Sequence, residues 1–231
     1  MKRRRFKPYI KVHKEGYAIL FSLLTLLVVL NILVYLQSPA KIVVFIQLLI
    51  SVTAFSFFLF FFRNPTRNVY IDDNNLVLAP ADGRIVVIEP TEEFEYFGGE
   101  KRIQISIFMS VFSVHANWYP IFGTVKYIKH HDGVHRAAYL PKSSHENERT
   151  SVVIESVSKK HKILVRQIAG ALARRIVTYA AVNRECHLNE HLGFIKFGSR
   201  VDIFLPMDSE IFVTMGERTK GNETIIARLS D

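Results

Sequence analysis

Hydrophobic and polar positions divide the chain into two parts with different patterns. The first part holds two long apolar runs, residues 17–36 and 42–62, and neither run contains a charged residue. At about 1.5 Å per residue, a helix of either length spans roughly 30 Å, which matches the hydrocarbon core of a bilayer. Five residues separate the runs, so the pattern predicts a transmembrane helical hairpin.

From about residue 69 onwards, short runs rich in Val, Ile and aromatic residues recur every 8 to 12 residues or so. Turn-forming pairs fall between many of these runs: Asp82-Gly83, Gly98-Gly99, Asp132-Gly133 and Gly221-Asn222. This pattern predicts a mainly β fold, a compact antiparallel β-sandwich or barrel with few short helices. AGALARRI, residues 169–176, is the best candidate for a short helix.

The charges divide in the same way as the hydrophobic pattern. The net charge is +9, and the first fifteen residues hold seven Lys and Arg against Glu15, so they supply +6 and leave +3 for the rest. Arg63 and Arg67 follow the second run, so both ends of the hairpin are expected on the cytoplasmic side. A hairpin that dips into one leaflet fits these charges equally well. A basic arm beside an apolar span favours anionic lipid headgroups as its partner, not nucleic acid.

We therefore expect a basic cytoplasmic arm at residues 1–16, a two-helix membrane anchor at 17–62 and one β-rich domain at 63–231. A cleaved signal peptide is the competing interpretation, because Ser38-Pro39-Ala40 is an acceptable cleavage site. However, the apolar core of a signal peptide is usually shorter, and here a second apolar run follows at once. The single cysteine, Cys186, excludes an internal disulfide.

The histidines offer one motif that resembles a metal site. His187, Glu190 and His191 have the H-x-x-E-H spacing of inverted zinc peptidases, which requires a stable helix and a third ligand downstream. Gly193 follows closely, and a strand-like run comes next, so we interpret these residues as part of a loop and expect no metal.

Gly198-Ser199 lies between two strand-like runs, where such a pair is normally a turn or bulge. The same two residue types also suit self-cleavage of the chain. A Ser hydroxyl can attack the preceding carbonyl and convert the amide to an ester, and a preceding glycine has no Cβ to crowd that attack. Elimination of the ester and hydrolysis then leave an N-terminal pyruvoyl group.

Six segments, taken in order, resemble the phosphatidylserine decarboxylase family, in particular its short bacterial form with an N-terminal membrane segment. The resemblance covers about residues 63–206, with a weaker tail to the C-terminus. The segments are LAPADGRIV, FMSVFSVHANWYP, HENERTSVVIE, QIAGALARRIV, LGFIKFGS and FGSRVDIFLP.

The resemblance implies that the proenzyme cuts itself between Gly198 and Ser199. A β chain of residues 1–198 and an α chain of residues 199–231 stay associated, and Ser199 becomes the pyruvoyl cofactor. The amine of the serine headgroup forms a Schiff base with its ketone, which accepts the electron pair released with CO₂. Phosphatidylserine thus becomes phosphatidylethanolamine in phospholipid biosynthesis.

The resemblance also assigns roles to Asp82, as a carboxylate in self-cleavage, and to His115, as a proton donor or acceptor near the pyruvoyl group. Longer members carry a second histidine three residues further on, paired with the carboxylate, where this chain has Trp118. His115 serves both steps, or another residue is the base of the cleavage. Arg200 is a candidate for binding the substrate's carboxylate or phosphate, although an exposed strand arginine fits the pattern equally well.

The partners expected are the lipid substrate, the membrane and the second chain of the same precursor, with a homo-oligomer left open. Aromatic residues such as Trp118 and Tyr119 are expected at the membrane interface. A non-enzymatic membrane adaptor with a lipoyl-like β-sandwich is the alternative, because APADGRIVVI resembles the opening strand of such modules. An uncleaved, degenerate member of the same family is a third reading. Both alternatives predict an intact chain and an inert Ser199.

Overall fold

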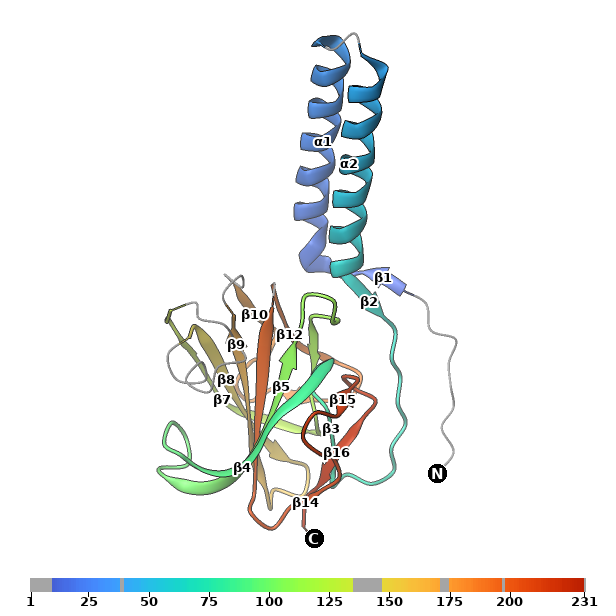
Figure 1. Ribbon diagram of the computed structural model, residues 1–231. Coiled ribbons are helices and arrows are strands. Elements are labelled where there is room, and N and C mark those ends of the chain that lie inside the picture. The colour runs from blue at the N-terminus through green and yellow to red at the C-terminus, as the bar shows by residue number, and fades with distance from the viewer. Residues whose placement is uncertain (1–9, 38–39, 135–146, 171–174, 197, 231) are drawn as a thin grey trace. The chain divides into compact units, whose positions relative to one another are not determined.

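The computed structural model describes residues 10–37, 40–134, 147–170, 175–196 and 198–230. The chain forms two compact units, and the boundary between them falls between Thr66 and Arg67. Figure 1 shows a unit of two long helices and a unit that consists of β-strands.

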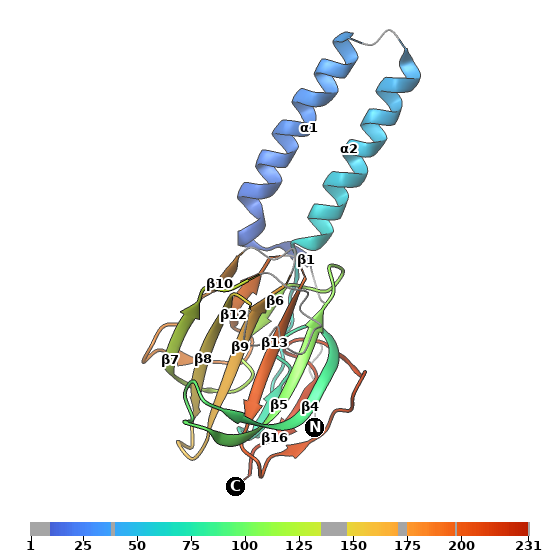
Figure 2. The same ribbon diagram turned by 60° about the vertical axis from the view of Figure 1, so that its left-hand side comes forward.

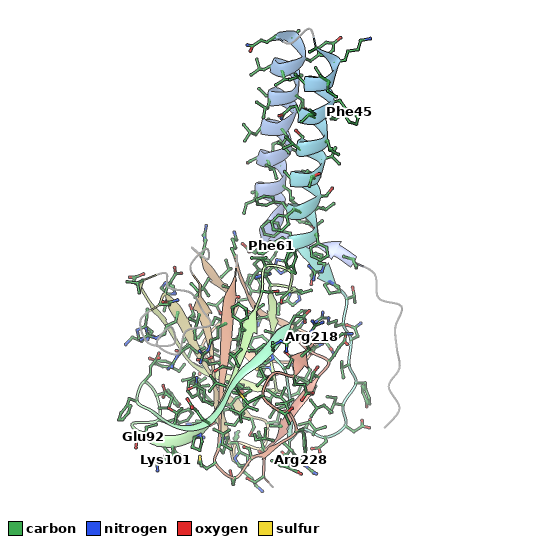
Figure 3. All side chains as sticks on the ribbon, in the orientation of Figure 1. Phe45, Phe61, Glu92, Lys101, Arg218 and Arg228 are labelled. Atoms are coloured by element: carbon green, nitrogen blue, oxygen red, sulfur yellow. The ribbon has the colours of Figure 1, made fainter. Side chains whose placement is uncertain are left out.

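The helical unit contains α1 (Tyr17–Gln37) and α2 (Lys41–Phe61), which confirm the two predicted apolar helices. Both are long and apolar enough, by length and composition alone, to cross a membrane. Their apolar side chains are mostly exposed, and Figure 3 shows Phe45 pointing away from α2. Apolar helices that expose their side chains in this way are typical of lipid-facing segments.

The two ends of this hairpin are fastened together. Strands β1 (Ile10–Val12) and β2 (Arg63–Pro65) pair antiparallel, and the 3₁₀-helix η1 (Lys14–Gly16) leads into α1. Further along the helices, Asn31 Nδ2 donates a hydrogen bond to Ser51 Oγ at 2.8 Å. Hydrogen bonds between polar side chains stabilise helix pairs in lipid.

The β unit is built around an eight-stranded antiparallel sheet in the part of the chain that the structure describes. Figure 2 shows its central strands side by side. In order across the sheet they are β11 (Glu185–Cys186), β7 (Gly123–His131), β8 (Arg149–Ser156), β9 (Lys162–Ala169), β13 (Ser199–Leu205), β5 (Glu100–Met109), β4 (Gly83–Glu93) and β15 (Arg218–Thr219). Bulges in β4 and β7 bend the sheet.

Two three-stranded sheets complete the described part of the β unit. One has the order β10 (Ile176–Thr178), β12 (His191–Ile195) and β6 (Ala116–Trp118), and the other β14 (Glu210–Ile211), β16 (Ile225–Arg228) and β3 (Leu76–Leu78). Both add side chains to one apolar core. The mainly β, antiparallel class predicted from the sequence is therefore confirmed.

Alternation along the strands decides which side chains enter this core. In β13, Val201, Ile203 and Leu205 lie in the core, and the alternate residues Arg200 and Asp202 face the other side of the sheet. Ser199 is two positions before Val201, so its side chain is on the core side.

The short helix predicted at residues 169–176 is wrong at both ends. Ala169 is the last residue of β9, and Ile176 is the first residue of β10, whereas residues 171–174 lie outside the described part. The Cα atom of Ala169 pairs with that of Ser199, so strand pairing overrides the helix propensity of the alanines here.

Candidate active site

Ser199 is the first residue of the strand in the middle of the large sheet. Strand β13 pairs with β5 through Met109 and with β9 through Ala169 at this position. The Ser199 side chain is fully buried, and its hydroxyl donates a hydrogen bond to Met109 Sδ at 3.2 Å. The two neighbouring strands and the contact with Met109 thus fix the position of the hydroxyl.

Gly198 gives the chain a sharp change of direction immediately before Ser199. Its φ of +61° lies in the left-handed region, which glycine adopts without steric cost. A Cβ built on Gly198 would meet no described atom within 4 Å beyond its chain neighbours. Glycine therefore suits this position through its backbone conformation.

His115 lies beside the same peptide segment. Its Nδ1 is 2.9 Å from the carbonyl oxygen of Ser113, and its Nε2 is 3.3 Å from the backbone nitrogen of Gly198. A carbonyl oxygen only accepts, so Nδ1 carries the proton, and Nε2 accepts from the Gly198 N–H. A fully buried imidazole with an unprotonated Nε2 thus lies next to the Gly198-Ser199 pair.

A buried amide pair lies on the core side of the sheet near Ser199. Gln167 Nε2 donates to Asn117 Oδ1 at 2.7 Å, and Asn117 Nδ2 lies 3.7 Å from the same Met109 sulfur that Ser199 contacts. Gln167 Oε1 is buried and has no hydrogen-bond partner among the described residues. An acceptor of this kind favours a polar occupant, because an unpaired buried polar group is costly.

Asp82 lies at the same end of the large sheet as Ser199. Phe108 of β5 pairs with Arg84 on one side and with Arg200 on the other. Asp82 lies two residues before Arg84, and Ser199 lies one residue before Arg200. The two strands are separated by about two strand spacings, or roughly 10 Å. The Asp82 carboxylate accepts hydrogen bonds from Arg67 and from the backbone N–H of Gly221.

Arg200 points to the opposite face of the sheet from Ser199. Its Nε donates to Asp202 Oδ1 at 2.5 Å, and its Nη2 donates to Ser106 Oγ at 2.6 Å. The side chain is almost fully buried, so the exposed strand arginine considered from the sequence is wrong. The structure does not bring the guanidinium together with the Ser199 hydroxyl.

Trp118 and Tyr119 do not form the exposed aromatic contact that the sequence suggested. Only 1% of Trp118 and 3% of Tyr119 is exposed, so neither can rest on a membrane surface. The Trp118 ring packs edge to face against His191, and Tyr119 belongs to the main core. Aromatic residues in this segment fill the interior, and the sequence pattern alone does not separate that role from an interfacial one.

The histidine motif at residues 187–191 is not helical. His187 and Glu190 lie in the turn between β11 and β12, and His191 is the first residue of β12. The helical spacing that an inverted zinc peptidase requires is therefore absent from this segment. Within the described residues, no group of three or more His, Cys, Asp and Glu side chains is arranged to hold a metal ion.

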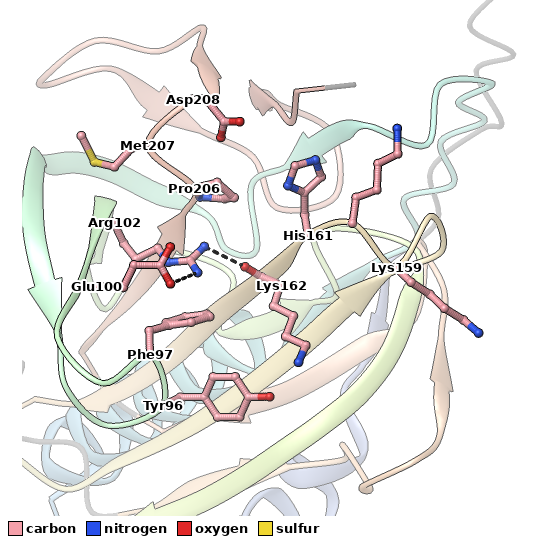
Figure 4. Close-up of a pocket in the computed structure, with 11 residues that line it drawn as sticks. Tyr96, Phe97, Glu100, Arg102, Lys159, His161, Lys162, Pro206, Met207 and Asp208 are labelled. Carbon is pink, nitrogen blue, oxygen red and sulfur yellow. Dashed lines mark hydrogen bonds and ion pairs between the residues drawn. The ribbon is translucent and has the colours of Figure 1, made fainter.

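A cavity of about 670 Å³ lies at the other end of β13 (Figure 4). Pro206 and Asp208, which line it, follow the last residue of the strand, whereas Ser199 is the first. Six residues of extended chain separate the ends by roughly 20 Å. The cavity, where Arg102 pairs with Glu100, is therefore separate from Ser199.

Several residues around Ser199 were not identified from the sequence. Met109, Asn117 and Gln167 stand in ordinary strand patterns that carry no signal of a site. Arg67 was interpreted only as a flanking charge of the hairpin, although it is bound to Asp82. Met109, Asn117 and Gln167 come together only through the pairing of distant strands and the packing of two sheets.

Comparison with known proteins gives one consistent result. Residues 54–227 match the family model described as phosphatidylserine decarboxylase. A phosphatidylserine decarboxylase proenzyme of Phocaeicola vulgatus is 50% identical over 229 residues, 99% of this chain and 100% of the relative. Proteins with the same description from Bacteroides thetaiotaomicron (50% identity; 95% of this chain, 96% of the relative) and Porphyromonas gingivalis (48%; 96% and 100%) are similar over comparable lengths.

Proposed function

Because the chain belongs to the phosphatidylserine decarboxylase family, we propose that it is a proenzyme that cuts itself between Gly198 and Ser199 and then converts phosphatidylserine to phosphatidylethanolamine and CO₂. The observation that carries the proposal is the geometry at Ser199. A buried hydroxyl follows a left-handed glycine, and the unprotonated Nε2 of His115 lies at the amide of that glycine.

In the cleavage, Ser199 Oγ attacks the carbonyl carbon of Gly198 while its proton passes to His115 Nε2. The peptide C–N bond breaks, the nitrogen takes a proton, and Gly198 is left as an ester on Oγ. Removal of the Ser199 α-proton then breaks the Cβ–Oγ bond, which releases the Gly198 carboxylate and leaves dehydroalanine. Water adds and ammonia leaves, so Ser199 becomes a pyruvoyl group without any external oxidant.

The surroundings of Ser199 fit a pyruvoyl group. Gln167 Oε1 is a buried acceptor on the same face of the sheet as Ser199, and it suits a polar headgroup. The pyruvoyl group supplies a ketone that takes up the substrate's amine and accepts the electron pair released with CO₂.

His115 has two tasks in this proposal. It takes the hydroxyl proton during cleavage and later delivers a proton from Nε2 to the carbon that loses CO₂. The hydrogen bond from Nδ1 to Ser113 fixes the ring orientation for both tasks. Full burial of the ring keeps competing water away from this proton.

Asp82 orients the cleavage site, and Arg200 supports it from the opposite face of the sheet. The proposal does not use Arg200 as a direct ligand of the substrate, because its guanidinium is bound to Asp202 and Ser106.

We place the enzyme at the cell membrane with the catalytic domain on the cytoplasmic side. The helical hairpin has both ends joined by β1 and β2, and basic residues flank it. An anchored enzyme suits this reaction because its lipid substrate stays in the bilayer.

The test is reductive trapping on phosphatidylserine vesicles. The wild-type chain and a Ser199→Ala variant are incubated with carboxyl-labelled lipid and cyanoborohydride, and CO₂ and the mass of each fragment are measured. We expect CO₂ release and a lipid adduct on the fragment of residues 199–231, both lost in the variant. Equal CO₂ release by both proteins would contradict the proposal.

A further inference from the structure

Asp82 and Arg67 form a buried ion pair at the Ser199 end of the large sheet. Arg67 donates from Nη2 to Asp82 Oδ2 at 2.8 Å and from Nη1 to Oδ1. Only 8% of the Arg67 side chain and 15% of the Asp82 side chain are exposed. A bidentate arginine–carboxylate pair in such a site is strong and fixed in geometry.

The guanidinium of Arg67 also joins two further segments. Its Nη1 donates to the carbonyl oxygen of Gly221 at 2.9 Å, and the N–H of Gly221 donates to Asp82 Oδ1 at 2.8 Å. The guanidinium carbon lies 4.9 Å from the centre of the Trp118 ring. A Cβ on Gly221 would come within 2.5 Å of that ring, so only glycine fits there without a shift.

These contacts reach the segment that holds His115 through Trp118. Trp118 lies three residues after His115, and its backbone N–H donates to the carbonyl oxygen of Pro80 at 2.9 Å, two residues before Asp82. The segment that holds Asp82 and the strand β6 that follows His115 are thus joined by the backbone and by Arg67. A displacement of Asp82 or Trp118 therefore also displaces β6 and His115, which directly precedes this strand.

The chemistry of the pair excludes it as the proton acceptor. A guanidinium remains protonated at all physiological pH values, and both carboxylate oxygens already accept hydrogen bonds from Arg67 or Gly221. The Arg67–Asp82 pair can therefore fix the positions of neighbouring groups, and His115 is the residue that transfers the proton.

We infer that Arg67 is a positioning residue for self-cleavage, which clamps Asp82, Gly221 and Trp118 and thereby holds His115 at the Gly198-Ser199 bond. The inference rests on the proposed cleavage. It also identifies Arg67 as the residue that pairs with Asp82 in this chain, where longer members of the family carry a second histidine at the position of Trp118. Arg67 and Asp82 belong to the β chain and Gly221 to the α chain, so the same clamp joins the two products after the cut.

The experiment follows cleavage of the full-length chain, synthesised in a cell-free system with lipid nanodiscs. Appearance of the fragment of residues 199–231 is timed for the wild type and for Arg67→Ala, Arg67→Lys and Arg84→Ala. Arg84 is the matched control, because it also donates to a backbone carbonyl of the α chain, that of Gly216, at 2.9 Å. It lies on β4, and its hydrogen bond to Gly216 does not involve Asp82.

We expect Arg67→Ala to cleave at least about tenfold more slowly than wild type, because small misplacements of reacting groups cost this much or more. Arg67→Lys keeps the charge and loses the two-pronged geometry, so it should recover only part of the rate. Arg84→Ala should match the wild type. Added guanidinium ion, far below denaturing concentrations, should accelerate Arg67→Ala several-fold and leave the other proteins unchanged.

Two outcomes overturn the inference. One is wild-type cleavage by Arg67→Ala. The other is slow cleavage that guanidinium does not rescue and that is accompanied by a loss of thermal stability. Thermal stability is measured on variants that also carry Ser199→Ala and therefore stay uncut. Failure of the proposed function looks different, because then the wild-type chain itself stays whole.

Discussion

At the residue scale, the backbone of Gly198 and the side chain of Ser199 define the reaction. The left-handed φ of +61° at Gly198 is accessible to glycine and costs other residues about 1–2 kcal/mol. Among the described residues, a Cβ at this position meets nothing within 4 Å beyond its chain neighbours, so the effects expected of a side chain there are backbone strain and crowding of the adjacent carbonyl.

Replacing Gly198 with alanine should therefore slow self-cleavage strongly and lower the free energy of unfolding by about 1 kcal/mol. Gly98 offers a matched control, because its φ is +64° and a Cβ there also meets nothing within 4 Å. Gly98→Ala should lose similar stability, by denaturant unfolding in a Ser199→Ala background, yet cleave at the wild-type rate. Equal cleavage rates for both alanine variants would contradict a special role of Gly198.

Two other buried residues predict how stability depends on pH. Burial raises the pKa of the Cys186 thiol from 9.0 to about 12, and burial together with the nearby Cys186 raises the pKa of Tyr119 from 10.0 to about 12. In the unfolded chain both groups ionise at their lower, ordinary values. Their contribution to stability is therefore complete below pH 9.0 and is lost as the pH rises towards about 12.

Thermal unfolding of the full chain should show a midpoint that falls steadily above pH 9.0. Cys186→Ala removes one of the two groups, so its midpoint should fall less steeply over the same range. The native thiol should also react slowly with thiol reagents until the protein is unfolded, since the thiolate is the reactive form. Rapid labelling of the folded protein at neutral pH would contradict the buried, neutral state of Cys186.

At the element scale, β13 explains how the two products of cleavage stay together. Its residues pair with β5 on one side and with β9 on the other, and Val201, Ile203 and Leu205 enter the core. Strands β14, β15 and β16 of the same fragment pair with one another or with strands of the larger fragment. A central strand with three core side chains should remain bound when the chain before it is cut.

Ile203→Ala should weaken this attachment, because truncation of a buried isoleucine costs about 2–5 kcal/mol. The small fragment should then dissociate from the large one at a lower denaturant concentration, as measured by size-exclusion chromatography. Arg228→Ala, which removes an exposed ion pair with Asp73, should change stability by less than about 1 kcal/mol. Loss of the small fragment from the wild-type enzyme without denaturant would contradict the predicted retention.

At the scale of the whole molecule, the boundary between Thr66 and Arg67 separates the helical hairpin from the β unit. The sequence prediction started the catalytic domain at residue 63, four residues earlier. The difference matters because Arg67, the first residue of the β unit, binds Asp82, so the β unit has to include Arg67.

A chain that begins at Arg67 should fold, cleave itself and decarboxylate a water-soluble, short-chain phosphatidylserine. It should not sediment with vesicles, because it lacks both apolar helices. Removal of Arg67 as well should slow the cleavage. Vesicle binding by the truncated chain at the level of the full chain would contradict anchoring by the hairpin.

The sequence predicted those features that depend on local pattern. Two uncharged runs predicted α1 and α2, and short β-rich runs between turns predicted the antiparallel class. It could not predict that Met109, Asn117 and Gln167 meet near Ser199, because strand register within the large sheet and the packing of β6 against that sheet bring them together. The burial of Trp118 and the strand conformation of Ala169 were misread for the same reason, since tertiary packing overrides local preference there.

The central claim is that Ser199 becomes a pyruvoyl group when the chain cuts itself, and intact-protein mass spectrometry tests it most directly. The purified wild-type chain should give fragments of 198 and 33 residues, since 231 minus 198 is 33. The small fragment should be lighter by one ammonia than simple hydrolysis would give, and both fragments should be absent from Ser199→Ala. A single uncut chain in a folded wild-type preparation, or a small fragment with an unmodified N-terminal serine, would contradict the account.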